Sequence, residues 1–342
     1  MLKQIATIVF CLFTSTVVFA NDFIPDFKDQ YQRLNSKVEV RYISHGTPGK
    51  PLVLFVHGNP EHRKSWSFYL KNLGKDYFAV ALDQPGVYRG WRPKTFEGHK
   101  YDKVAKVIKK FAKAIGYKKF YLVGHDAGGL YTWGVALKYP KSVLGITVIN
   151  AAHPYTYSRE YYRSNSSQYE SAQYIRNILS KDPSKGWTVS AIREANYEKF
   201  TNHIFGDYGT RNYFYEHPEN RENLINLWKE SDDVVQGYLN YYFTFDFPPQ
   251  DPNSWLGLTG FVMRRLLEIK IPSQLIWGLG DKDQAPENLD GLSKVVPQVK
   301  IVRFATGSHW VIHEFPYEIE REIRHHIDEI AKARRESSKG AF

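Results

Sequence analysis

The sequence predicts an α/β fold, in which helices flank a mostly parallel central sheet and a helical segment is inserted late in the sheet. Over the first 150 residues, short apolar runs alternate with segments of helical periodicity, a pattern typical of βαβ units. Between 151 and 250 the alternation stops, and helical patterns rich in tyrosine and asparagine take its place. Apolar runs then return, which indicates a helical cap between two strands of the sheet.

The predicted elements follow one another along the chain. Val38 to Ile43 alternates polar and apolar residues, so we expect it at an exposed edge of the sheet. Further strands are expected at Pro51 to His57, Phe78 to Asp83, Phe120 to Asp126, Val143 to Ile149, Gln274 to Trp277 and Val299 to Phe304, and helices at Tyr101 to Ile115, Leu130 to Tyr139 and about Tyr317 to Arg334.

The N-terminus has the pattern of a cleaved secretory signal. Lys3 precedes an apolar stretch, and Val18 to Ala20 supplies the small residues that a signal peptidase recognises. We therefore expect residues 1–20 to be removed after Ala20 and the mature protein to be periplasmic or secreted. Cleavage would also remove Cys11, the only cysteine, which suits an oxidising compartment. An uncleaved anchor is the alternative, although the apolar stretch is short for a membrane span.

The surface charge does not by itself predict a polyanion partner. The net charge is +10, but no arginine-rich tract, zinc-finger spacing or helix-turn-helix pattern accompanies it. We expect no nucleic-acid binding, and at most a weak interaction with acidic membrane surfaces.

A predicted strand–turn–helix unit is the strongest chemical signal. Glycines lie two residues before and two after Asp126, as a strained nucleophile elbow requires. A carboxylate is already ionised at neutral pH, so it needs no base to attack. Its attack on a saturated carbon gives an ester that water can cleave. Asp126 is therefore a candidate nucleophile toward an sp3 carbon with a leaving group; the alternative is an ordinary polar turn.

Cleavage of such an ester needs a base and a residue that orients it. Among 12 histidines, His309 follows a late strand in a loop of small residues, and histidine has a suitable pKa for activating water. Asp281 follows the preceding strand and could hold the imidazole tautomer; Asp283 is its rival. The backbone N–H groups of Asn59 and Ala127 could form the oxyanion hole.

The order nucleophile, acid, histidine, each after its own strand, resembles the α/β-hydrolase superfamily. The resemblance covers nearly all of the mature chain. It implies an α/β-hydrolase core formed by 22–150 and 251–336, with residues 151–250 as a helical cap.

Two cap segments are similar to those that carry the paired lid tyrosines of epoxide hydrolases. The resemblance of Gln168 to Ile175 places the first of these tyrosines at Tyr174, and that of Leu239 to Phe243 places the second at Tyr242. It implies that both donate a proton to the epoxide oxygen. Because the chain has 24 tyrosines, Tyr169 and Tyr241 remain the nearest alternatives. The resemblance implies hydrolysis of a small hydrophobic epoxide to a vicinal diol, without cofactor or metal.

The sequence departs from this pattern at one position. Epoxide hydrolases and the related haloalkane dehalogenases usually carry tryptophan after the nucleophile, where this chain has Ala127. The loss of a halide-binding indole weakens a dehalogenase interpretation, but Asn59 matches the asparagine with which many haloalkane dehalogenases bind halide. Haloalkane or haloacid dehalogenation is therefore the alternative activity. A non-catalytic binding protein of this fold is a further alternative, against which the three triad positions argue.

Overall fold

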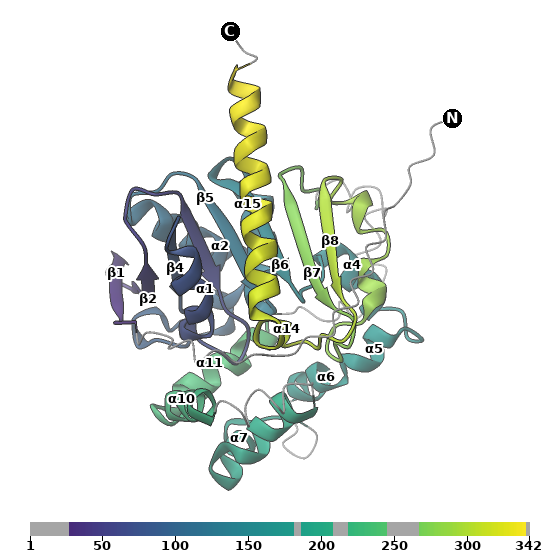
Figure 1. Ribbon diagram of the computed structural model, residues 1–342. Helices are drawn as coiled ribbons and strands as arrows, with labels where there is room; N and C mark the ends of the chain where they lie inside the picture. The colour runs from purple at the N-terminus through teal and green to yellow at the C-terminus, as the bar shows by residue number, and fades with distance from the viewer. Residues whose placement is uncertain (1–26, 181–185, 208–217, 245–266, 340–342) are drawn as a thin grey trace.

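The computed structural model describes residues 27–180, 186–207, 218–244 and 267–339 (Figure 1). The predicted signal peptide therefore lies outside the described residues. The described strands form one sheet in the order β1-β2-β4-β3-β5-β6-β7-β8. Their bounds are β1 Gln30–Asn35, β2 Val38–His45, β3 Leu52–Val56, β4 Phe78–Leu82, β5 Phe120–His125, β6 Val143–Ile149, β7 Ser273–Gly278 and β8 Val299–Phe304.

The two pairings that involve β2 are antiparallel, and the remaining pairings in the sheet are parallel. The core helices are α1 Ser67–Leu73, α2 Tyr101–Ala114, α3 Ala127–Lys138, α14 Val311–Glu314 and α15 Pro316–Lys339. This mostly parallel sheet with flanking helices confirms the predicted fold class.

Strand β3 shows why helices cover both faces of the sheet. Successive side chains of a strand point to opposite faces. Leu52, Leu54 and Val56 accordingly belong to a hydrophobic core shared with α2 and α3, whereas Val53 and Phe55 belong to a second core shared with α1 and α15. Figure 1 shows α1 and α15 on the sheet face turned toward the viewer.

Two sequence predictions about the ends of the fold are wrong. β1 pairs with the outer side of β2, so Val38 to Ile43 is not an edge strand, and Val40 and Ile43 are fully buried. β1 was not predicted because its sequence QYQRLN is mostly polar and gives a half-exposed strand. The last helix extends to Lys339, five residues past the expected Arg334.

Between β6 and β7 the described chain is helical. The helices are α4 Pro154–Tyr161, α5 Ser167–Ser171, α6 Gln173–Leu179, α7 Val189–Arg193, α8 Glu198–Thr201, α10 Pro218–Lys229 and α11 Asp232–Tyr242. Figure 1 shows α6, α7, α10 and α11 gathered below the sheet, near α14. The division into domains stays a prediction, since residues 245–250 lie outside the described part of the chain. In the described part, none of the helices combines the length and the apolar character that crossing a membrane requires.

A buried ionic cluster joins β2, β4 and the start of the first helical turn after β3. Asp83 Oδ2 accepts hydrogen bonds from Arg41 Nε at 2.6 Å and from the Arg63 guanidinium at 3.1 Å. Burial alone would raise the pKa of Asp83, but the charges of Arg63 and Arg41 outweigh it and lower the pKa. All three side chains are nearly inaccessible to solvent, so their charges compensate one another, and the less buried Asp29 is a further partner of both arginines.

Replacing Asp83 with alanine should therefore destabilise the fold, because Arg41 and Arg63 lose their shared buried acceptor. We expect the free energy of unfolding in urea to fall by about 3–5 kcal/mol. Glu194→Ala, which removes an exposed ion pair with Lys199, is the control and should change it by about 0.5 kcal/mol or less. Similar unfolding midpoints for the two variants would contradict the structural role of the cluster.

Candidate active site

The turn between β5 and α3 is a strained elbow that holds up Asp126. Asp126 has φ 51° and ψ −119°, a conformation that L-residues rarely adopt. A Cβ atom on Gly124 would lie 2.3 Å from the carbonyl oxygen of Gly128, and one on Gly128 would lie 2.1 Å from that of Val56. Neither position has room for a side chain. The two glycines thus let α3 pack against β3 and β5 with Asp126 at the apex.

His309 lies between Asp126 and Asp281. Its Nδ1 is 2.8 Å from Asp281 Oδ2, and its Nε2 is 3.5 Å from Asp126 Oδ2. His309 follows β8, Asp281 follows β7 and Asp126 follows β5, and all three side chains are largely buried. The structure therefore brings together the three residues that the sequence singles out as a triad.

Asp126 and His309 each stabilise the charged form of the other. Burial opposes ionisation of Asp126, but interaction with His309 outweighs it and holds the pKa of Asp126 below its usual value. Burial likewise opposes protonation of His309, yet Asp281 and Asp283 raise its pKa well above the ordinary value. In the resting site Asp126 is therefore an anion beside a protonated His309.

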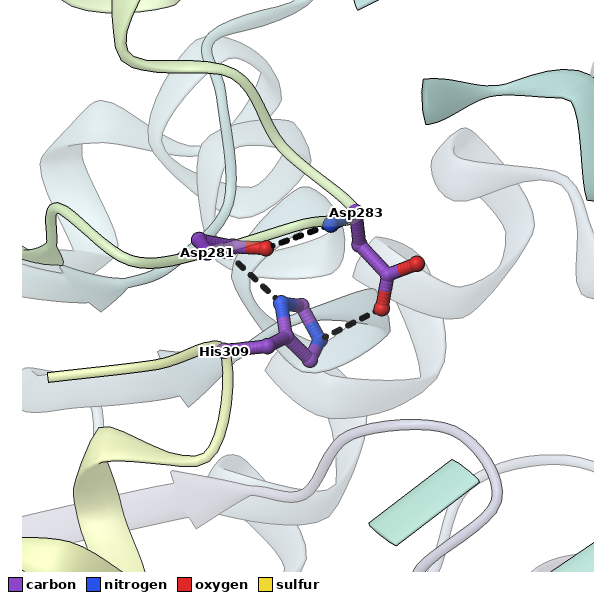
Figure 2. Close-up of side chains that lie close together, drawn as sticks. All are labelled: Asp281, Asp283 and His309. Atoms are coloured by element: carbon purple, nitrogen blue, oxygen red, sulfur yellow. Dashed lines mark hydrogen bonds and ion pairs between the residues drawn. The ribbon is translucent and has the colours of Figure 1, made fainter. Parts of the chain in front are cut away.

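Asp281 and Asp283 contact different nitrogens of the imidazole ring, as Figure 2 shows. Asp281 Oδ2 faces Nδ1, while Asp283 Oδ2 lies 3.8 Å from Nε2. Asp281 Oδ1 also accepts the backbone N–H groups of Asp283 and Gln284. This geometry favours Asp281 as the residue that orients His309.

The same three residues do not form a convincing metal centre. Their ligand atoms lie within 4.8 Å of one another, but Asp281 and Asp283 face opposite nitrogens of the ring. One ion cannot bind both nitrogens of His309, and Nδ1 is already engaged by Asp281.

Sequence reasoning missed the role of Asn150, which ends β6. Its Nδ2 donates to Asp281 Oδ2 at 2.6 Å, and its Oδ1 accepts the N–H of Gly278 at 3.0 Å. Asn150 therefore fixes Asp281 from the neighbouring strand. Its position directly after a buried strand, where some relatives of this fold place the acid, marked the residue but not its contact with Asp281.

A buried network behind His309 was also missed. His125 donates from Nε2 to the backbone carbonyl of His309 at 2.8 Å, and its Nδ1 is 3.4 Å from Glu61 Oε2. Glu61 Oε1 in turn lies 2.6 Å from His313 Nε2. Burial alone would raise the pKa of Glu61, but His313 and His125 lower it well below its usual value. The network thus supports the loop that carries His309.

The predicted oxyanion donors lie beside Asp126. The backbone N–H of Asn59 donates to Asp126 Oδ1 at 2.6 Å. Ala127 is the first residue of α3, so its N–H has no acceptor within the helix. The Asn59 side chain is engaged elsewhere, since its Nδ2 donates to the Tyr238 carbonyl at 3.2 Å. Ala127 itself is fully buried and lines neither of the two cavities at Asp126.

These two cavities meet at Asp126, and Tyr174, Tyr242 and Asp283 line both of them. The larger has a volume of about 220 Å³. The rings of Tyr174 and Tyr242 are 5.8 Å apart, nearly perpendicular. Of the two alternative proton donors, Tyr241 lines the larger cavity. Tyr169 lines neither cavity, and the guanidinium of Arg176 lies over its ring at 4.0 Å.

Replacing Asn150 with alanine should loosen the site, because Asp281 and the Gly278 N–H both lose a buried partner. We expect the free energy of unfolding to fall by about 1–3 kcal/mol. Asn240→Ala on α11, whose amide bonds only to a neighbouring side chain among the described contacts, is the control and should cost about 0.5 kcal/mol or less. Equal stability of the two variants would contradict a supporting role for Asn150.

Comparisons with known proteins agree with this geometry. The family described as "alpha/beta hydrolase fold" matches residues 51–316. Epoxide hydrolase 4 of Mus musculus is 26% identical over 286 residues, which span 82% of this chain and 74% of that protein. The crystal structure of a Bacillus megaterium epoxide hydrolase with an inhibitor has a TM-score of 0.74 and 27% identity, covering 87% of this chain and all of that one.

A fluoroacetate dehalogenase of a Burkholderia species is 27% identical over a shorter stretch of 143 residues, 39% of this chain and 47% of that protein. The family match spans most of the sequence, from β3 to the start of α15. The protein therefore belongs to the α/β-hydrolase family, as an epoxide hydrolase-like hydrolase.

Proposed function

We propose that this protein hydrolyses an epoxide to a vicinal diol through a covalent ester on Asp126. One observation carries the proposal: a carboxylate at the apex of the elbow faces a cavity that His309 and two cap tyrosines also line. A serine at the apex would favour acyl substrates, whereas a carboxylate favours attack on saturated carbon. The named activity of the mouse and Bacillus relatives supports the same reaction.

In the first step Asp126 attacks an epoxide carbon. Asn59 holds Oδ1, so Oδ2 is the attacking atom, and Oδ1 becomes the carbonyl oxygen of the ester. The opened epoxide oxygen needs a proton, for which we propose Tyr174 and Tyr242. Burial raises the pKa of Tyr174 well above its ordinary value, so its phenol is protonated at neutral pH and can donate.

In the second step His309, oriented by Asp281, activates water. Ester formation removes the negative charge of Asp126, one of the groups that keep the pKa of His309 high. His309 can then lose its proton and act as a base. Water attacks the ester carbonyl, and the N–H groups of Asn59 and Ala127 stabilise the oxyanion on Oδ1.

Epoxide hydrolysis is better supported than dehalogenation. A halide site needs donors aimed at the leaving group, but position 127 is a buried alanine. The Asn59 amide, the other expected halide donor, already donates to the Tyr238 carbonyl. The apolar lining of the smaller cavity, which includes Ile178, Trp187 and Leu239, suits a small hydrophobic substrate.

The His309→Gln variant tests the reaction directly. Asp126 can still attack, but water is no longer activated, so steady-state turnover should fall by about 100-fold or more and the ester should accumulate. Mass spectrometry should then find the whole mass of the epoxide added to the peptide that contains Asp126.

Asp126→Asn, which lacks the nucleophilic carboxylate, is the control and should form no adduct. An alkyl adduct with halide release from haloalkanes would replace the proposal with dehalogenation. The absence of any adduct from epoxides and haloalkanes would favour a non-catalytic binding protein.

We also infer from the N-terminal sequence that the protein is exported. Cleavage after Ala20 predicts that the mature protein in the periplasm or medium begins at Asn21. N-terminal sequencing of protein expressed from the full-length gene checks this, and a cell-bound chain that retains Met1 would contradict it.

A further inference from the structure

The two proposed steps require a proton to leave His309 between them. His309 is protonated in the resting site, because Asp281, Asp283 and Asp126 outweigh its burial. It must be neutral before it can activate water. Ring opening requires a proton elsewhere in the site, because the epoxide oxygen takes one from a cap tyrosine and that tyrosine must then be reprotonated. A group that contacts Nε2 and shares the cavity with the tyrosines could satisfy both needs.

Asp283 occupies this position. Its Oδ2 is 3.8 Å from His309 Nε2, and its side chain is 16% exposed, so it faces the cavity without being fully enclosed. Figure 2 shows its carboxylate turned toward the Nε2 edge of the ring, on the side away from Asp281. Asp283 and Tyr174 both line both cavities.

The backbone of Asp283 is fixed from two directions. Its N–H donates to Asp281 Oδ1 at 2.7 Å, and its carbonyl accepts from Gln168 Nε2 of helix α5 at 3.0 Å. The carboxylate is thus presented at the junction between the triad and the cap. A role in orienting Nδ1 of His309 is excluded, because Asp281 engages that nitrogen.

We propose that Asp283 is a catalytic proton relay between His309 and the cap tyrosines, an inference that rests on the proposed epoxide hydrolysis. As Asp126 Oδ2 bonds to carbon, the C–O bond breaks and its electron pair stays on oxygen, which takes the proton of Tyr174. Asp283, which is ionised at the start, takes a proton from His309 Nε2 and passes it to the Tyr174 phenolate. The result is a neutral ester, a hydroxyl group, neutral Tyr174, neutral His309 and ionised Asp283.

The second step restores the proton on His309. Neutral His309 takes a proton from water as hydroxide adds to the ester carbonyl, and collapse of the oxyanion releases the diol. One proton of the water ends on the released alcohol and the other on His309. Asp126 becomes a carboxylate again, so no proton is gained or lost over the cycle.

The surroundings of Asp283 suit a group that both accepts and donates a proton. Burial raises its pKa to about 7; His309 opposes this rise, whereas Asp281 and Asp126 add to it. A pKa near the working pH is favourable for proton transfer in both directions. After burial, the charge of Asp283 is among the causes that raise the pKa of Tyr157 on α4 and of Tyr174 on α6.

The test compares ester formation and ester hydrolysis in single-turnover experiments on the full-length wild-type enzyme and the Asp283→Asn variant, using a panel of aliphatic and aryl epoxides. Asparagine keeps the shape but cannot relay a proton. We expect the ester to form in the variant and its hydrolysis at pH 7 to slow by about 100-fold. Hydrolysis in the variant should accelerate as pH rises, because solvent then removes the proton that His309 retains.

Asp290→Asn, the same change at an exposed position on the same loop, is the matched control and should behave as the wild type does. Asp283→Glu should recover much of the hydrolysis rate. If Asp283→Asn does not fold, as judged by circular dichroism, Asp283→Ser removes the carboxylate with a smaller side chain.

If the folded Asp283→Asn variant hydrolyses the ester at the wild-type rate and with the wild-type pH profile, the relay is overturned and the proposal of epoxide hydrolysis is unaffected. Failure of the wild-type enzyme to form an ester or diol from any epoxide would overturn both proposals. A purely structural role for Asp283 would lower stability and slow both steps at every pH, and that result would also overturn the relay.

Discussion

A single buried imidazolium is the interaction on which the site depends. His309 meets Asp126 at one nitrogen and Asp281 at the other, with Asp283 close by. Unpaired carboxylates are very unfavourable in so enclosed a position, so the positive charge on His309 stabilises the three loops that meet around it in the resting site. The sheet makes this possible, since parallel strands β5, β7 and β8 present their carboxyl ends along the same edge.

Much of this arrangement could be predicted from local sequence. Buried parallel strands are short, nearly continuous apolar runs, and the elbow needs glycines at fixed spacing, so the positions of the parallel strands along the chain and Asp126 were accessible. His309 and Asp281 followed from their positions after strands. The paired tyrosines Tyr174 and Tyr242 came from resemblance, because nothing in spacing alone separates them from the chain's other tyrosines.

The remaining features depend on contacts between distant segments. Asn150 meets Asp281 across 131 positions, and Glu61 meets His313 across 252; no local pattern marks such a partner. The half-exposed β1 was missed because its alternation is mostly polar. The choice between Asp281 and Asp283 depended on which nitrogen each carboxylate faces, which only the folded loop determines.

The side chain of Gln168 connects the cap to the loop that follows β7. Besides its bond to the Asp283 carbonyl, Gln168 accepts hydrogen bonds from the Ala285 N–H and the Asn288 amide. Helix α5 is therefore hydrogen-bonded at three points to the loop that carries Asp281. A cap that swung open as one rigid body would break these buried bonds and leave their partners unsatisfied. Opening at this end of the cap would also have to break the bonds that Arg159 of helix α4 donates to the carbonyls of Glu287 and Asp290.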